Sequence, residues 1–264
     1  VLGVTIPDIG TTTFRPPYTP TTFGAIAGRE PGDFLDVTRT TPMHDWHVEH
    51  GALFEDVGQW KRAWYYPKTG ESMHATVDRE CRAVRESVGL LDASTLGKII
   101  VKGPDAAEFL NRVYTNKWMK LGVGRCRYGL MLGEDGMIMD DGAEDEFLMT
   151  TTTGGAAGVL SHLEDYLQTE WTDLKVYLTS VTEQWAVASI NGPKARDLLA
   201  ELCDDVDLSP EAFKFMEWKE ATVAGLPARI FRISFTGDLA FEVNVPADKG
   251  MALWTALMTA GAKY

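Results

Sequence analysis

The sequence is poor in cysteine, has fewer basic than acidic residues, and lacks a long apolar run. Its three cysteines, Cys81, Cys126 and Cys203, are too scattered for a disulfide framework or a zinc cage, and the odd count suits a reducing compartment. Lys and Arg number 25 against 38 Asp and Glu, and the resulting net charge of -13 repels phosphate backbones and anionic lipid headgroups. No stretch approaches the roughly 20 apolar residues that span a bilayer. We therefore expect a cytoplasmic protein that binds neither nucleic acid nor membranes.

Nucleotide-binding fingerprints are also missing. The chain contains neither GxGxxG after a strand nor GxxxxGK[ST], which argues against a dinucleotide site or a P-loop. What is present is an ordinary globular composition, with 45% hydrophobic and 10% aromatic residues. A length of 264 residues suits one large domain or two modest ones.

Residues 1–55 are predicted to form an extended arm. Proline fixes φ and removes a backbone donor, and no helical period is sustained among the six prolines of this stretch: Pro7, Pro16, Pro17, Pro20, Pro31 and Pro42. We expect this arm to come from a preceding domain, because a stretch of this composition at a chain start is usually a linker from, or a strap onto, another domain or subunit. The sequence opens on Val1 rather than on a methionine, so either the chain is processed or it is part of something longer.

A strand–turn–helix unit occurs twice in the remainder. VKGPDAAEFLNR (101–112) and INGPKARDLLAE (190–201) share Gly-Pro, an alanine and a leucine at the same offsets. Because repeats of this size indicate duplicated supersecondary modules, we expect an α+β domain over residues 56–264.

Apolar periodicity predicts the other elements. Apolar residues at steps of three and four from Ser72 indicate one helix that ends before Asp92. Further helices are expected at 105–113, 156–167 and 247–258, and strands at 96–104, 126–132, 137–140, 146–153, 185–190, 228–235 and 239–245.

Three histidines, His44, His47 and His50, recur at every third position in HDWHVEH. On a helix this spacing would gather the imidazoles on one side as a possible metal face. The spacing matches no established zinc signature, however, and the favoured interpretation is structural, with no metal bound.

Two strands present carboxylates with alternative interpretations. Asp140 and Asp141 end the run MIMDDG, and strand alternation lets only one of them face a given pocket. Glu242 lies between Phe241 and Val243, so it points away from those apolar side chains. By pattern alone, the two aspartates are better explained as solvated turn residues, and Glu242 is equally consistent with the solvent-facing side of its strand.

Taken together, these segments resemble a known family. RAVRESVGLLDAS, IIVKGPDAAEFLNRVYTN, GRCRYGLMLGEDGMIMDDG, INGPKARDLL and SFTGDLAFEVNVP are similar to the folate-binding aminomethyltransferase fold of glycine-cleavage T-proteins. TTTFRPPYTPTTFGAIAGRE, HDWHVEHGALFEDVGQWKRAWYYP and FLMTTTTGGAAGVL resemble the C-terminal half of the α subunits of heterotetrameric sarcosine oxidases. The resemblance implies a body built around a tetrahydrofolate site, without the family's C-terminal barrel portion.

The resemblance also implies site residues. The catalytic acid of the family falls on Asp141, and the acid that holds the pterin falls on Glu242, here in Ala-Phe-Glu rather than Gly-aromatic-Glu. A carboxylate suits the pterin because it accepts two parallel N–H donors at once. The pocket-wall positions of the family fall on Leu96, Ile100, Tyr128, Thr152, Phe215 and Phe235.

The implied function is capture of the one-carbon unit of oxidised sarcosine on tetrahydrofolate, giving 5,10-methylene-tetrahydrofolate. The implied partners are a flavin-binding β subunit and the small subunits of a hetero-oligomer, with flavins and NAD outside this chain. Alternatives are a glycine-cleavage-type or dimethylglycine-type aminomethyltransferase, a non-catalytic folate-binding relative, and a metal-dependent enzyme that uses the three histidines.

Overall fold

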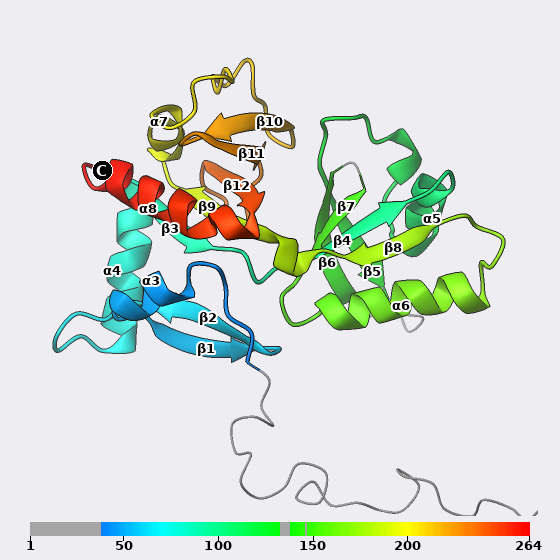
Figure 1. Ribbon diagram of the computed structural model, residues 1–264, viewed down its shortest axis with the longest axis horizontal. Helices are drawn as coiled ribbons and strands as arrows, with labels where there is room; N and C mark the ends of the chain where they lie inside the picture. Colours follow the sequence, from blue (N-terminus) through cyan, green and yellow to red (C-terminus); the bar gives the residue numbers. More distant parts are fainter. Residues whose placement is uncertain (1–37, 133–137, 146) are drawn as a thin grey trace, which may run out of the picture. The chain divides into compact units, whose positions relative to one another are not determined.

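The computed structural model describes residues 38–132, 138–145 and 147–264, the stretch 138–145 through its backbone alone. One compact unit extends from Arg39 to Tyr264. It contains two five-stranded antiparallel sheets and a separate two-stranded hairpin of β1 (Leu53–Val57) and β2 (Trp60–Tyr65). The expected α+β class is confirmed (Figure 1).

The first sheet has the strand order β5-β6-β7-β4-β8. Its members are β5 (Arg127–Leu132), β6 (Ile138–Asp145), β7 (Leu148–Thr151), β4 (Gly97–Lys102) and β8 (Tyr177–Ser180). Helices α5 (Ala106–Val113) and α6 (Ala156–Thr169) contribute Phe109, Leu110, Val159 and Leu163 to a core that includes Ile99 and Met131 of this sheet.

The second sheet repeats this plan with the order β10-β11-β12-β9-β3. Its members are β10 (Trp218–Val223), β11 (Leu226–Phe231), β12 (Ala240–Pro246), β9 (Trp185–Asn191) and β3 (Gly89–Asp92). Helices α7 (Ala195–Ala200) and α8 (Gly250–Gly261) cover its core, which includes the fully buried Phe241 and Val243. Figure 1 shows α7 and α8 beside β9 to β12, and α6 beside β4 and β8.

The duplicated module predicted from the Gly-Pro repeats occupies the same place in both sheets. β4 and β9 are each fourth in order, and each leads through Gly-Pro into α5 or α7. Gly103 and Gly192 have φ of 136° and 119°, a region that L side chains rarely adopt. A Cβ at Gly192 would lie 2.4 Å from the carbonyl oxygen of Val84, so the repeat requires glycine at this turn.

The two halves exchange a strand. β3 precedes β4 in sequence but pairs with β9, whereas β8 precedes β9 but pairs with β4. Residues 93–96, which connect β3 to β4 and are called the crossing segment below, bond to β9, because Ser94 Oγ accepts from the Val187 N–H at 2.9 Å. Thr182, which lies between β8 and β9, bonds to β4, because its Oγ1 accepts from the Lys98 N–H at 3.0 Å. The segment between β3 and β4 is thereby held between the sheets.

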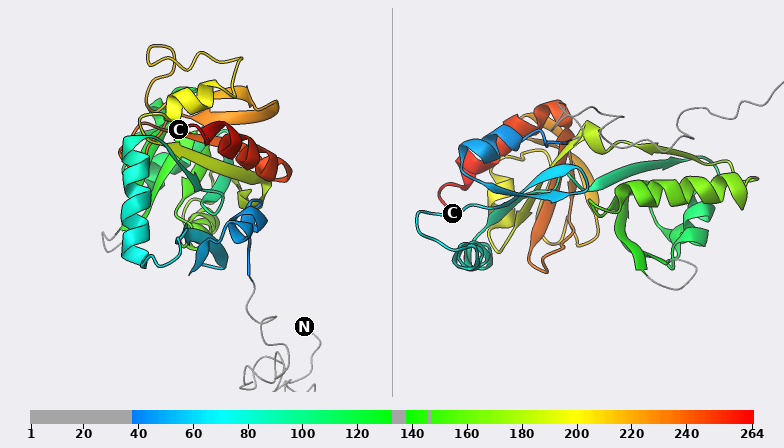
Figure 2. Two further views of the ribbon diagram at one scale, coloured as in Figure 1. Left: turned by 90° about the vertical axis from the view of Figure 1, so that its left-hand side faces the viewer. Right: turned by 90° about the horizontal axis from the view of Figure 1, so that it is seen from below.

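Helix α3 (His44–Glu49) and helix α4 (Met73–Glu86) complete the described unit, together with short 3-10 turns at Trp118–Lys120, Thr182–Gln184 and Ala247–Lys249. α3 lies against α8 (Figure 2). The ring centroids of Trp46 on α3 and Trp254 on α8 are 5.6 Å apart. No helix in the described ranges is long and apolar enough to cross a membrane.

Several expected elements differ from the structure. The helix expected up to residue 91 ends at Glu86, because Ser87 leaves helical geometry and residues 89–92 pair with β9 as β3. The arm expected over 1–55 falls mostly outside the described residues, but residues 44–49 and 53–55 are helix and strand rather than extended arm. The hairpin β1–β2 and the strands β8 and β10 were missed.

Candidate functional site

Three strands of the second sheet place a row of side chains beside the crossing segment. Glu242 pairs with Ser189, and Ser189 pairs with Leu91, so the three residues lie side by side on one face of β12, β9 and β3. Phe241 and Val243 point to the opposite face and are fully buried there. The alternation expected for Glu242 is therefore confirmed, but its face meets a pocket instead of open solvent.

This pocket has a volume of about 420 Å³, within the usual range for small-molecule sites. One wall is the row just described, and another is formed by Tyr128 and Thr150–Thr153 of the first sheet. Strand β3 supplies Asp92, and the crossing segment supplies Ala93, Thr95 and Leu96. The hairpin β1–β2 supplies Glu55, Arg62, Ala63 and Trp64. Both sheets, the crossing segment and the hairpin β1–β2 thus contribute to one cavity.

The Glu242 carboxylate is an acidic group of this pocket, and its side chain is only partly exposed. Within the described part of the chain it makes no hydrogen bond. Burial raises its pKa to about 7, while the nearby charge of Lys98 acts in the opposite direction. A carboxylate without a hydrogen-bond partner can accept donors from a ligand.

Lys98 is almost completely buried, with 2% of its surface exposed. Its ammonium donates to the carbonyl oxygens of Leu96 at 2.7 Å and Ser94 at 3.1 Å, both in the crossing segment. Burial lowers its pKa to about 8, and the charges of Glu242 and Asp92 oppose that change. Sequence reasoning missed Lys98, although a lysine inside the apolar run LGKIIV was a usable signal.

Asp92 is a buried acid at the pocket. Its Oδ2 lies 3.1 Å from His47 Nε2, its Oδ1 accepts from the Ser94 N–H at 3.0 Å, and His47 Nδ1 lies 2.6 Å from the Tyr66 hydroxyl. Although burial would raise the pKa of Asp92, hydrogen bonds from His47 and Ser94 keep it below its ordinary value. Tyr66, His47 and Asp92 therefore form a buried chain of hydrogen bonds that ends at the pocket.

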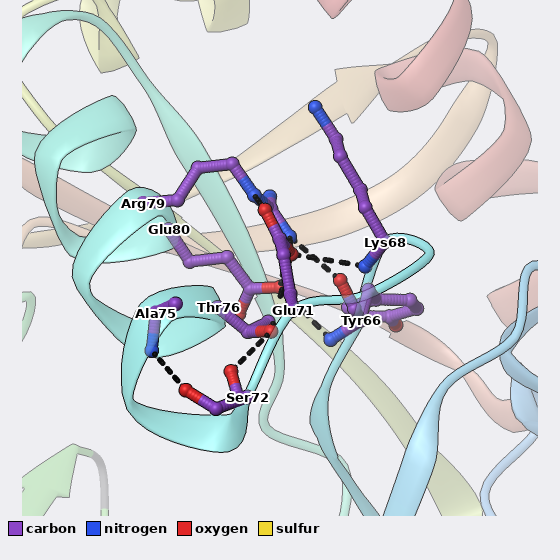
Figure 3. Close-up of polar contacts among 8 residues, drawn as sticks. All are labelled: Tyr66, Lys68, Glu71, Ser72, Ala75, Thr76, Arg79 and Glu80. Atoms are coloured by element: carbon purple, nitrogen blue, oxygen red, sulfur yellow. Dashed lines mark hydrogen bonds and ion pairs between the residues drawn. The ribbon is translucent and has the colours of Figure 1, made fainter.

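Helix α4 fixes the position of Tyr66. The Tyr66 N–H donates to Glu80 Oε1 at 2.8 Å, and its carbonyl oxygen accepts from Arg79 at 2.7 Å. Arg79 also bonds both carboxylate oxygens of Glu71, as Figure 3 shows. This cluster anchors both backbone groups of Tyr66 and so aims its hydroxyl at His47.

The structure places five of the wall and pterin residues implied by the resemblance in the pocket: Leu96, Tyr128, Thr152, Phe235 and Glu242. Two others lie elsewhere. Ile100 packs on a cluster between the sheets that includes Leu148 and Phe231, and Phe215 is half exposed beside the guanidinium of Arg232. Ile100 follows Lys98 on the same face of β4, and neither residue lines this pocket.

Asp141 lies on β6, where its backbone pairs with Leu130, and Asp140 pairs with Met131. Tyr128 is two positions from Leu130 on β5 and pairs with Ala143. The side chains of both aspartates lie outside the described part of the structure.

The three histidines have separate environments. His47 bonds Asp92, His50 stacks on Trp46 at a centroid distance of 3.7 Å, and His44 contacts Phe54. Among the described residues, no group of three His, Cys, Asp or Glu side chains is arranged to hold a metal ion.

Known proteins are similar to this chain in sequence and in fold. The GCVT N-terminal domain family matches residues 43–264. Sarcosine oxidase subunit alpha of Corynebacterium sp. (strain P-1) is 58% identical over 100% of this chain and 28% of its own length. An aminomethyltransferase of Thermotoga sp. (strain RQ2) is 31% identical over 83% of this chain and 58% of its own length.

Two solved structures are similar. Glycine cleavage system aminomethyltransferase T from Bartonella henselae matches with a TM-score of 0.69 and 26% identity, covering 83% of this chain and 57% of that one. A chain of heterotetrameric sarcosine oxidase from Corynebacterium sp. U-96 matches with a TM-score of 0.52 over 85% of this chain and 95% of that one, and its 16% identity shows the fold alone. This chain spans 28% of the sarcosine oxidase alpha subunit of strain P-1. It belongs to the GCVT N-terminal domain family, and it is similar over its whole length to sarcosine oxidase alpha subunits.

Proposed function

We propose that this chain forms a tetrahydrofolate site in which the one-carbon unit of oxidised sarcosine is captured as 5,10-methylene-tetrahydrofolate, with release of glycine. The observation that carries this proposal is the Glu242 carboxylate, which faces a pocket of about 420 Å³ without a hydrogen-bond partner among the described residues. The names of the sarcosine oxidase and aminomethyltransferase relatives support the same reaction class.

The residues of the pocket fit a reduced folate. A pterin presents an N–H beside an amino group, and a carboxylate accepts such a pair of parallel donors through its two oxygens. Leu96, Tyr128 and Phe235 supply apolar or aromatic surface for a flat heterocycle, and Thr152 adds a polar group. When bound, tetrahydrofolate supplies the nitrogens that take up the one-carbon unit.

The site residues then have separate roles. Glu242 would orient the pterin, and Leu96 and Tyr128 would exclude water from its faces. We assign Asp141 the role of a negative charge that stabilises positive charge at the reacting amine and relays its proton. Ile100 and Phe215, which lie outside the pocket, have no direct contact in this scheme.

Oxidation itself belongs elsewhere in the proposed assembly. We propose a flavin-binding β subunit and small subunits as partners, with flavin and NAD bound outside this chain, since its alpha-subunit relatives are several times longer. A cytoplasmic location agrees with the small number of cysteines.

The test is to supply the assembled hetero-oligomer, which includes the proposed flavin-binding subunit, with sarcosine in the presence and in the absence of tetrahydrofolate. The proposal predicts methylene-tetrahydrofolate in the presence of the cosubstrate and free formaldehyde in its absence. Folate binding without a change in formaldehyde yield would instead indicate a non-catalytic folate-binding domain.

A further inference from the structure

Lys98, which is buried, and Glu242, which is half-buried, carry opposite charges at the same place. Both line a cavity of about 10 Å³ next to the larger pocket, with room for about one water molecule. Asn244, two residues after Glu242 on β12, lines the same cavity and is 5% exposed. Burying an ammonium is costly unless a compensating charge lies nearby, so the position of Lys98 calls for a negative partner.

The ammonium of Lys98 is held by backbone rather than by a carboxylate. Two of its three donors reach the carbonyl oxygens of Ser94 and Leu96. These carbonyls belong to the segment that crosses between the sheets, so the charge is fixed to the frame of the pocket. A charge fixed in this way acts on neighbouring groups without reorganising.

The other titratable groups around Glu242 have hydrogen-bond partners elsewhere or line the small cavity. Asp92 on β3 bonds His47 and the Ser94 N–H. Arg62 on β2 forms two bonds to Glu55 on β1, at 2.9 and 2.7 Å. From the first sheet, Tyr128 donates to the Ser234 carbonyl oxygen and Cys126 lines the small cavity. Lys98 is the described group whose charge acts on Glu242.

We propose that Lys98 is a positioning residue whose charge favours the ionised form of Glu242, the form that accepts the two donors of the ligand. Lys98 acts on the ligand through that carboxylate and does not touch it. This inference rests on the proposed function and adds to it the origin of the charge that recognises the pterin.

The experiment is a titration of the intact protein with 5-formyl-tetrahydrofolate between pH 5.5 and 9. In the wild type, affinity should rise through a midpoint near pH 7, where Glu242 loses its proton. In Lys98→Met the midpoint should move up by about one pH unit or more, while affinity near pH 9 stays within a few-fold of the wild type. Lys98→Arg, which keeps the charge, should keep the midpoint.

Lys102→Met is the matched control, because Lys102 is exposed on the same strand, and it should leave the profile unchanged. A purely structural role for Lys98 would lower affinity equally at every pH and would overturn the proposal. An unshifted midpoint in Lys98→Met would do the same.

A second measurement separates this inference from the proposed function. Carbon-13 NMR of the Glu242 carboxyl, assigned with Glu242→Gln, follows its titration without any ligand. If the protein binds no reduced folate, the proposed function fails, yet the pKa of Glu242 must still rise in Lys98→Met. An equal pKa in both proteins would overturn the role of Lys98, and Lys98→Gln provides the same comparison if Lys98→Met does not fold.

Discussion

The ring of His47 and the carboxylate of Asp92 lie 3.1 Å apart, although 45 residues separate them in sequence, and both side chains are almost completely buried. This contact joins helix α3 to the last residue of β3, which lines the pocket. Although sequence patterns assigned residues 44–49 to an arm, the contact makes this helix part of the site's framework.

Replacing His47 should therefore destabilise the protein strongly. His47→Ala leaves the buried Asp92 carboxylate without one of its donors, and we expect a loss of about 3–5 kcal/mol in the free energy of unfolding. His50→Ala is the control, because His50 is exposed and its loss should cost less than about 1 kcal/mol. Urea denaturation of both variants measures the difference, and equal stabilities would contradict a bracing role for His47.

The Gly-Pro turn at Gly192 should tolerate no side chain. With φ at 119° and a Cβ position 2.4 Å from the Val84 carbonyl oxygen, Gly192→Ala should cost about 3 kcal/mol or more. Gly225→Ala also has a positive φ but nothing within 4 Å of its Cβ, so strain alone should cost about 1–2 kcal/mol. Urea denaturation of both variants measures the two losses. A loss for Gly192→Ala no larger than that for Gly225→Ala would contradict the close contact assigned to Gly192.

Glu242 should lower the stability of the folded state above neutral pH. Between its ordinary pKa of 4.5 and about 7, the folded protein binds more protons at this group than the unfolded chain does. The free energy of unfolding therefore falls as pH rises through that window. We expect Glu242→Gln to be more stable than the wild type by about 1–3 kcal/mol at pH 8 and to show no such gain at pH 4.

Thermal or urea unfolding at both pH values checks this. Glu220→Gln, on an exposed position of the same sheet, should change stability at neither pH. A Glu242→Gln variant that is less stable at pH 8 would mean that the carboxylate has a stabilising partner.

Asp141 should affect transfer more than binding. If its charge matters most as positive charge develops, Asp141→Asn should leave flavin-linked peroxide formation nearly intact while methylene-tetrahydrofolate yield falls about 100-fold and formaldehyde rises. Asp140→Asn is the internal control, since neighbouring strand positions alternate between faces. A large effect from Asp140→Asn alone would assign the role to the other aspartate.

Local patterns in the sequence predicted much of the fold. The Gly-Pro repeats identified both strand–helix modules, because a turn with positive φ and a helix start leave a local signature. The alternation around Phe241 predicted that Glu242 points away from the core. The strand exchange of β3 and β8 could not be predicted, because pairing partners depend on contacts between distant segments.

The site, too, could be predicted only in part, because some of its contacts join distant segments of the sequence. Glu242, Leu96, Tyr128, Thr152 and Phe235 were named through resemblance and lie around one pocket. Lys98, Asp92 and His47 were not assigned to it, because their roles arise from burial and from partners on other strands. Ile100 and Phe215 show that a matching sequence position does not by itself determine where a side chain points.

The measurement that tests the central claim most directly is a calorimetric titration of the intact wild-type and Glu242→Ala proteins with tetrahydrofolate at pH 8. Loss of charge-assisted hydrogen bonds to the pterin should cost about 1.5–3 kcal/mol, a weakening of roughly 10- to 150-fold in the dissociation constant. Glu220→Ala should bind as the wild type does. An unchanged dissociation constant in Glu242→Ala would contradict the assignment of Glu242 as the pterin-holding acid.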